Sequence, residues 1–263
     1  MDLGLRDRVA VITGSSQGIG RAIAHCLASE GAKVTICARH EVGLKKAAEF
    51  ISSSTGVEVL PVQVDLKKSG NVKQMVMKTI KNFGRIDILV NNTGGPPSML
   101  FQETSERVWR EAVDLLLMSA VNCCREVIPY MKKRGWGRII NMASFGAKQP
   151  AEMLILSNTL RSGILGLTKT LSNELAEHGI LVNAVCPGWT WTERVKELAA
   201  AQAEKTGKRS EEVIAEWVSQ IPLKRLAKPE EIASVVAFLA SEKASYITGA
   251  VIQVDGGFIK SMI

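Results

Sequence analysis

The chain has 263 residues, and its content of 46% hydrophobic and 22% charged residues excludes a disordered or fibrous protein. Its apolar runs, such as residues 232–240, are far shorter than the roughly 18 residues that span a bilayer, and residues 1–6 hold no apolar signal core, so we expect a cytoplasmic protein with no membrane partner. The net charge of +7 is dispersed over separate basic clusters without interleaved aromatic residues, which favours a solvated surface over a nucleic-acid interface.

Short β-branched segments alternate with longer amphipathic helical patterns along the chain. The predicted strands cover residues 8–13, 33–38, 58–64, 86–91, 138–142, 181–186 and 251–254. The predicted helices cover residues 19–30, 42–53, 72–83, 154–177 and 229–239, with further helical patterns from 105 to 134. Strands that are linked by helical crossovers pair in parallel, and helices then cover both faces of the sheet.

This alternation predicts a single α/β domain over residues 1–263, a doubly wound Rossmann-type fold with a seven-stranded, mostly parallel sheet. Only residues 193–220 interrupt the alternation of strands and helices, because they are polar and helix-prone without an intervening strand. We expect this segment to form a substrate loop or lid over the C-terminal edge of the sheet.

A glycine-rich turn lies between the first predicted strand and the first predicted helix. A helix N-terminus presents unpaired N–H groups and a positive dipole end to a phosphate, and glycine lets the backbone approach that phosphate closely. In this strand–turn–helix context the turn predicts a dinucleotide-binding site. The residues predicted to contact the cofactor here are Gly14, Ser16, Gln17, Gly18, Ile19 and Gly20.

The ends of the next strands extend the predicted cofactor site. An acidic residue after the second strand would bind the ribose hydroxyls of NAD and repel a 2′-phosphate. The chain has Ala38 and Arg39 there, which favours NADP over NAD. The turns after the third and fourth strands reach the same sheet edge, and they add Asp65, Leu66, Asn92 and Gly94 to the predicted site.

The five cysteines lie in apolar segments with no CxxC pair and no nearby histidine. This pattern predicts buried thiols in a reducing compartment, and we assign no metal. Cys186, at the end of the sixth predicted strand, is the one thiol that could face a cleft.

Several motifs together resemble the short-chain dehydrogenase/reductase family. They are TGxxxGxG at 13–20, Asp65, NNxG at 91–94, Ser144, Pro187-Gly188, PEEIA at 229–233 and the tail from Ile247-Thr248-Gly249 to Asp255-Gly256-Gly257. The resemblance covers essentially the whole chain and looks most like the 3-oxoacyl-(acyl-carrier-protein) reductase branch. It implies an oxidoreductase that acts on a carbonyl or alcohol, and a homotetramer assembled through residues 105–134 and 229–263.

In this family a tyrosine donates a proton to the carbonyl. A lysine one helical turn later lowers the pKa of that tyrosine and holds the nicotinamide ribose. A serine binds the substrate oxygen, and an asparagine completes a water relay. The serine matches Ser144, but the tyrosine position holds Ser157, the lysine position Arg161 and the asparagine position Leu116. An aliphatic hydroxyl is a much weaker acid than a phenol, and a guanidinium with a pKa above about 12 is a poor proton carrier.

Tyrosine and lysine side chains elsewhere in the chain are the other candidates for the missing proton donor. Tyr130 and Tyr246 are not expected to reach the site, whereas Lys148 is either a relocated acid or a solvated loop lysine. Ser157 and Arg161 lie four residues apart on one helical face, so they could position a water or polarise a carbonyl together.

The resemblance also implies roles around the sixth strand and the lid. Pro187, Gly188 and Thr192 match the family's PGxxxT, which places Thr192 at the nicotinamide carboxamide. The neighbouring Trp189 and Trp191 either pack the lid or form an apolar wall for the substrate. Residues that could supply an apolar lining from the lid are Val195, Leu198, Val213, Ile214 and Trp217.

Two functions are compatible with these residues. The first is an NADP-dependent oxidoreductase with an atypical active site, in which Ser144 binds the substrate oxygen, Ser157 lies beside it and Arg161 supplies positive charge and ribose contacts. The second is a catalytically impaired, NADP(H)-binding pseudoenzyme that acts as a sensor or as the partner of an active paralogue. Both need the nucleotide, so the cofactor residues do not discriminate between them.

Overall fold

The computed structural model of the chain describes residues 2–262. Its sheet has seven strands in the order β3-β2-β1-β4-β5-β6-β7, and every strand pair is parallel. The strands are β1 (Val9–Ile12), β2 (Lys33–Ala38), β3 (Val59–Gln63), β4 (Ile88–Asn91), β5 (Gly137–Met142), β6 (Ile180–Pro187) and β7 (Val251–Val254). Strand order reverses between β1 and β4, so the loops after these two strands meet at the same edge.

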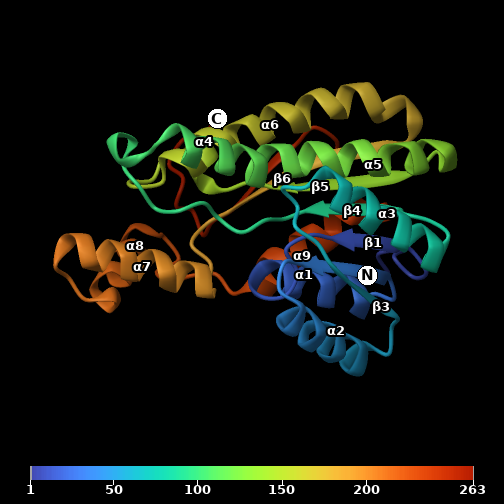
Figure 1. Cartoon of the computed structure of the whole chain (residues 1–263), viewed down its shortest axis with the longest axis horizontal. Coiled ribbons are helices and arrows are strands. Elements are labelled where there is room, and N and C mark those ends of the chain that lie inside the picture. The colour runs from blue at the N-terminus through green and yellow to red at the C-terminus, as the bar shows by residue number, and fades with distance from the viewer. Residues whose placement is uncertain (1, 263) are drawn as a thin grey trace.

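Helices cover both faces of the sheet, which confirms the predicted architecture (Figure 1). One face carries α1 (Gly18–Ser29), α2 (Glu41–Thr55) and α9 (Pro229–Ala240). The other carries α3 (Ser69–Phe83), α5 (Ser119–Arg134) and α6 (Ile155–Leu175). Among residues 2–262, no helix is both long and apolar enough to cross a membrane.

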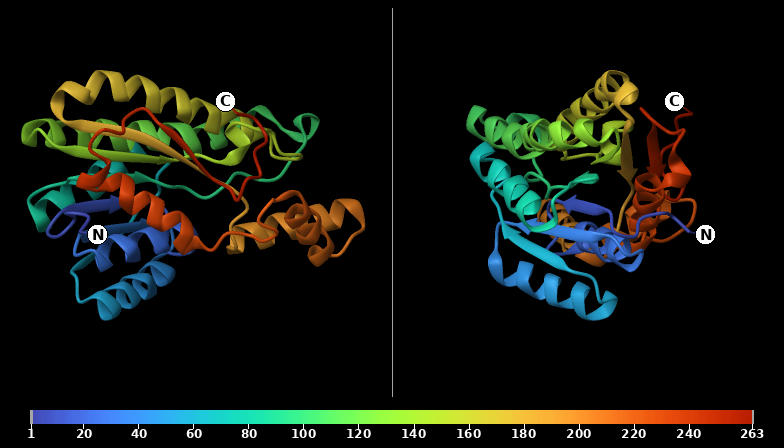
Figure 2. Two further views of the ribbon diagram at one scale, coloured as in Figure 1. Left: turned by 180° about the vertical axis from the view of Figure 1, so that it is seen from behind. Right: turned by 90° about the vertical axis from the view of Figure 1, so that its right-hand side faces the viewer.

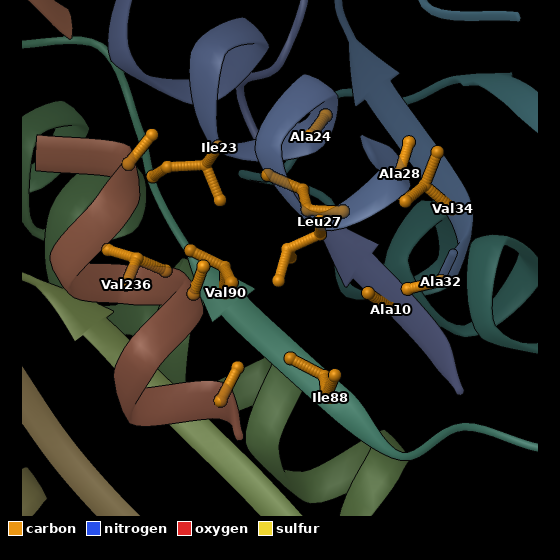
Figure 3. Packing of buried hydrophobic residues seen from close by; sticks show 14 of the residues in the cluster. Ala10, Ile23, Ala24, Leu27, Ala28, Ala32, Val34, Ile88, Val90 and Val236 are labelled. Carbon is orange, nitrogen blue, oxygen red and sulfur yellow. The ribbon is translucent and has the colours of Figure 1, made fainter. Parts of the chain in front are cut away.

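The core lies between these helices and the strands. Ile23 and Leu27 are spaced four residues apart on α1, so they point from one face of the helix towards Val90 on the sheet and Val236 on α9 (Figure 3). All four side chains are fully buried. Burial of each such side chain stabilises the fold by about 1.5–3 kcal/mol, so this packing fixes α1, and with it the turn that precedes the helix.

The predicted helical region 105–134 has an interruption. It divides into α4 (Glu106–Val113), one π-helical turn (Asp114–Met118) and α5. A π turn inserts one residue into the helix and rotates the side chains that follow it, and such turns occur frequently at functional sites. The other predicted elements are present, with ends that shift by a few residues.

The segment 193–220 forms two helices, α7 (Glu193–Thr206) and α8 (Ser210–Gln220), which project beyond the carboxyl edge of the sheet (Figure 2). The side chain of Thr192 accepts a hydrogen bond from the N–H of Val195 and so caps the first turn of α7. Trp217 of α8 stacks on Trp189 in the loop after β6, with ring centroids 4.0 Å apart, and Phe145 packs against Trp189. The lid helices therefore share a hydrophobic cluster with the loops beneath them and with Phe258 near the C-terminus.

Candidate functional site

One cleft of about 470 Å³ runs along the carboxyl edge of the sheet. Its walls come from the loops that follow β1 to β6 and from the first turns of α7. All of the residues predicted for the cofactor and for catalysis line this cleft: Gly14, Ser16, Gln17, Gly18, Ile19, Gly20, Arg39, Asp65, Leu66, Asn92, Gly94, Ser144, Ser157, Arg161, Pro187, Gly188 and Thr192. The tertiary structure thus brings the sequence-predicted residues to a single place.

The turn after β1 approaches its neighbours too closely for side chains. A Cβ on Gly20 would lie 2.3 Å from the carbonyl oxygen of Gly14 and 2.6 Å from Nδ2 of Asn92. Gly18 adopts a φ of +56°, in the left-handed region that favours glycine. The backbone N–H groups of the first turn of α1 therefore face the cleft without obstruction, as a bound phosphate would require.

Asn92 links the loop after β4 to the loop after β1. Its Nδ2 donates to the carbonyl oxygens of Thr13 at 3.1 Å and Gly14 at 3.0 Å. The hydroxyl of Thr13 in turn donates to the carbonyl oxygen of Asn92 and accepts from its N–H. The amide of Asn92 is thus committed to holding the two loops together, and the residue borders the cleft in that position.

Arg39 lies where the second strand ends, and it lines the cleft. Among residues 2–262, no carboxylate lies within 4.0 Å of its guanidinium, so its charge has no ion-pair partner there. Asp65, across the same end of the cleft, accepts a hydrogen bond from the N–H of Lys67. An unpaired guanidinium is a suitable partner for a phosphate group.

Arg161 is a buried cation. Its exposed fraction is only 8%, and Nη1 donates to the carbonyl oxygens of Met142 at 2.7 Å and Ala143 at 3.2 Å, at the end of β5. Burial, followed by repulsion from Arg194, lowers the pKa of Arg161 to about 10. Burial thus moves the pKa of this guanidinium below its ordinary value, because the cation loses hydration when α6 packs onto the sheet.

Two serine hydroxyls lie beside Arg161 in the cleft. The Oγ of Ser144 accepts a hydrogen bond from the N–H of Gly146 at 3.1 Å, so its own hydrogen remains available for donation. Ser157 is 9% exposed, and no group among residues 2–262 forms a hydrogen bond with its hydroxyl. Both hydroxyls can therefore donate to an oxygen atom that enters the cleft.

Leu116 lies in the π turn, but it faces the protein interior. It is 3% exposed and packs with Ala112, Leu156 and Leu160. The preceding residue, Leu115, lines the cleft instead. Leu116 borders a small cavity together with Asn91 and Ser119, and Leu66, Thr93 and Met142 lie between this cavity and the cleft because they line both.

The structure places the alternative groups away from the cleft. Cys186 is fully buried beside Ala143 and Ile164, so the suggestion that its thiol could face a cleft is wrong, and burial raises the pKa of this thiol to about 11. Tyr246 is fully exposed, Tyr130 packs against the core beneath α5, and Lys148 does not border the cleft. None of these side chains takes the place of the phenol.

The lid contributes fewer residues to the cleft than the sequence predicts. Val195 and Leu198 line it, whereas Val213, Ile214 and Trp217 pack inside the lid and do not. Of the two tryptophans, Trp189 borders the cleft and Trp191 is half exposed outside it. The spacing of apolar residues in a helix predicts which face is buried but not what that face packs against. Here α7 and α8 bury their apolar faces against each other.

Arg194 is not among the predicted site residues, and the structure adds it. From the first turn of α7 its Nη2 donates to the carbonyl oxygen of Pro96, across the cleft in the loop that follows β4. Nη1 lies 3.5 Å from the carboxylate of Glu197, and burial lowers the pKa of Arg194. Its position two residues after Thr192, in the first turn of the predicted lid, was the only sequence signal available.

Comparisons with known proteins agree over the whole chain. The family model described as Enoyl-(Acyl carrier protein) reductase matches residues 14–259. The chain is 38% identical over 256 residues to the 3-oxoacyl-[acyl-carrier-protein] reductase FabG of Staphylococcus epidermidis, covering 95% of this chain and 98% of that protein. It is 37% identical over 257 residues to the same enzyme of Aquifex aeolicus, covering 98% and 99%.

Solved structures give the same picture. L-Sorbose reductase from Gluconobacter frateurii, complexed with NADPH and L-sorbose, is 37% identical with a TM-score of 0.94 and 100% coverage of both chains. A variant of actinorhodin polyketide ketoreductase with NADPH is 32% identical with a TM-score of 0.93, covering 97% of this chain and 98% of that one.

We predict that Gly20→Ala disrupts the nucleotide turn, whereas Gly166→Ala on α6 does not. The new methyl at position 20 would meet backbone at 2.3 Å, but nothing lies within 4 Å of the position that it would take at 166. Gly166→Ala should stabilise the helix by about 0.5–1 kcal/mol, and Gly20→Ala should destabilise the protein by at least about 1 kcal/mol through overpacking. Urea denaturation of both variants measures this difference; equal stability of the two would contradict the packing argument.

Proposed function

Because the chain belongs to the short-chain dehydrogenase/reductase family, we propose that it is an NADP(H)-dependent oxidoreductase that interconverts a carbonyl and an alcohol at an atypical site. The observation that supports this proposal most directly is that the predicted cofactor residues and the predicted catalytic residues line one cleft. The glycine-rich turn after β1 borders the same space as three polar side chains, those of Ser144, Ser157 and Arg161.

The cofactor part of the cleft fits NADP(H). The crowded backbone at Gly20 leaves the N–H groups of α1 open for the pyrophosphate. The unpaired guanidinium of Arg39 suits the 2′-phosphate, and Ala38 and Arg39 stand at the end of β2, where an acidic residue would repel it. Gly94, Pro187, Gly188 and Thr192 border the remaining length of the cleft, towards the nicotinamide end.

Ser144 and Ser157 orient the substrate carbonyl. The Oγ of Ser144 accepts from Gly146, and its own hydrogen has no acceptor among the described residues, so it can be donated to a carbonyl oxygen in the cleft that Ser144 lines. The hydroxyl of Ser157 provides a second donor from α6. Loss of one such oxyanion donor typically costs about 10²–10³ in kcat.

Arg161 supplies the charge that the reaction needs. When bound, NADPH provides the hydride for the carbonyl carbon, and negative charge then develops on the oxygen. The carbonyls of Met142 and Ala143 hold the guanidinium of Arg161 at this end of the cleft, so it stabilises that charge without rearranging. Its lowered pKa makes Arg161 a stronger acid than an ordinary guanidinium, so in this proposal it returns a proton to the oxygen and regains one from solvent.

The remaining features of the proposal rest on the resemblance. The first substrates to test are 3-oxoacyl thioesters, because the bacterial relatives carry that name. We also propose a homotetramer in the cytoplasm. The second candidate function, a pseudoenzyme that binds NADP(H), is favoured by one observation, namely that Tyr130 and Tyr246 both lie away from the cleft.

The first prediction for the proposed function concerns turnover. Purified protein should oxidise NADPH in the presence of at least one member of a panel of ketones, aldehydes, 3-oxoacyl thioesters and oxo acids. Ser144→Ala should lower kcat by about 10²-fold while NADPH affinity is unchanged. NADPH binding with no turnover of any panel member would reject the oxidoreductase and support the pseudoenzyme.

A second prediction concerns cofactor choice. Arg39→Glu should weaken NADPH binding about 10- to 100-fold, because a charge-assisted contact to the 2′-phosphate is lost and a repulsive one is created. Affinity for NADH should not fall. Fluorescence titration measures both constants, and Arg125→Glu, on the exposed side of α5, is the matched control. Equal losses for the two nucleotides would show that Arg39 does not read the phosphate.

A third prediction concerns pH. Arg161 is cationic below its pKa of about 10 and neutral above it. The value of kcat/KM for reduction, which reports the groups of the free enzyme, should therefore be level from pH 7 to about 9 and fall as the pH rises through about 10. Circular dichroism at each pH controls for unfolding, and Arg110→Lys on exposed α4 should leave the profile unchanged. A profile that stays level to pH 11 would remove Arg161 from the mechanism.

A further inference from the structure

We propose that Arg161 and Arg194 form an anion-binding site at the substrate end of the cleft, and that the substrate is an oxo acid whose carboxylate lies a few atoms from the carbonyl. The carbonyl half of this inference rests on the proposed function. The anion site itself rests on the arrangement of charges around the cleft.

The first argument is the uncompensated charge of Arg161. Only 8% of the residue is exposed, and its guanidinium donates hydrogen bonds only to backbone carbonyl oxygens. Among residues 2–262, no carboxylate lies within 4.0 Å of its guanidinium. A buried charge without a countercharge is costly, so an anion that enters the cleft gains free energy by pairing with it.

The second argument is the proximity of Arg194. Its side chain is only 33% exposed and crosses the cleft to the carbonyl of Pro96. The positive charge of Arg194 is, after burial, the largest cause of the lowered pKa of Arg161, because the two guanidiniums repel each other. Glu197, which pairs with Arg194, is 65% exposed and does not border the cleft. An anion between the two cations would relieve the repulsion of both.

The third argument is the location of acidic groups. Only Asp65 and Glu193 are acidic among the described residues that line the cleft. Asp65 follows β3, at the end that the adenosine would occupy, and Glu193 is 61% exposed and pairs with Lys196 at 2.7 Å. Among the described residues, no acidic side chain at this end of the cleft therefore competes with a substrate anion for Arg161, and the carboxylate that pairs with Arg194 belongs to the exposed Glu197, outside the cleft.

The rest of the lining defines the size and polarity of the substrate. Ser144 and Ser157 offer hydroxyl donors for the carbonyl oxygen next to Arg161. The neighbouring walls are apolar and come from Leu115, Leu154, Trp189, Val195 and Leu198. A short apolar chain that carries a carbonyl and a carboxylate matches both kinds of surface.

The cofactor, like the proposed substrate, carries an anionic group, because its pyrophosphate is also an anion that a guanidinium could bind. The turn of α1 already offers backbone N–H groups for that pyrophosphate. Arg194 is therefore assigned to the substrate, and the experiment has to separate these two sources of negative charge.

The test is calorimetric titration of the NADP⁺ complex, in which no reduction takes place. The ligands are 2-oxopentanoate, 3-oxobutanoate and 4-oxopentanoate, each compared with its methyl ester. At least one acid should bind about tenfold more tightly than its ester, and Arg194→Gln should abolish that preference while NADP⁺ affinity stays within about twofold. Arg194→Lys should retain part of the preference. Arg209→Gln, on the exposed start of α8, should change neither constant.

Two results would overturn the inference: equal binding of every acid and its ester by the unaltered protein, or a loss of NADP⁺ affinity in Arg194→Gln as large as the loss for the acid. The second result would assign Arg194 to the pyrophosphate. Tight acid binding without turnover in the NADPH assay would contradict the proposed oxidoreductase and leave the anion site standing. Turnover of neutral carbonyls with no preference for acids would support the proposed oxidoreductase and contradict the anion site.

Discussion

The close approach of the loops after β1 and β4 is the constraint on which the site depends. Four hydrogen bonds join Thr13, Gly14 and Asn92, and the absence of a Cβ at Gly20 lets α1 begin directly against them. Since strand order reverses between β1 and β4, this junction opens the crevice in which such sheets bind ligands. The packing of α1 on α9 and the sheet then holds the junction in place.

The second determinant is a buried charge at the other end of the cleft. Arg161 satisfies the last carbonyl groups of β5 and so joins α6 to the sheet edge. The same burial lowers the pKa of its guanidinium and leaves its charge without a carboxylate. One residue thus connects the packing of a helix with the electrostatics of the site, and its neighbour Ser157 shares the same helical face.

The lid connects both ends of the cleft. Thr192 caps α7, and Arg194 extends from the first turn of that helix to Pro96, which lines the cleft in the loop after β4. A further tie is the ion pair between Lys205 near the end of α7 and Glu103 in the loop before α4. The stack of Trp189 and Trp217 joins α8 to the loop after β6, and apolar side chains of α7 and α8 pack in the same cluster, so α7 presents Val195 and Leu198 to the cleft as parts of a preformed wall.

The sequence by itself determined the sheet, the glycine-rich turn before α1 and the residue types of the candidate site. These depend on local patterns: the strand and helix periods, the glycines before α1, and the identities of Ser144, Ser157 and Arg161 at fixed spacings. Tertiary structure alone decided the rest. It buried Cys186, turned Leu116 inward through a π turn, placed Trp217 inside the lid and brought Arg194 to the cleft. It also lowered the pKa of Arg161, because burial and the charge of a residue 33 positions away depend on contacts that no local spacing encodes.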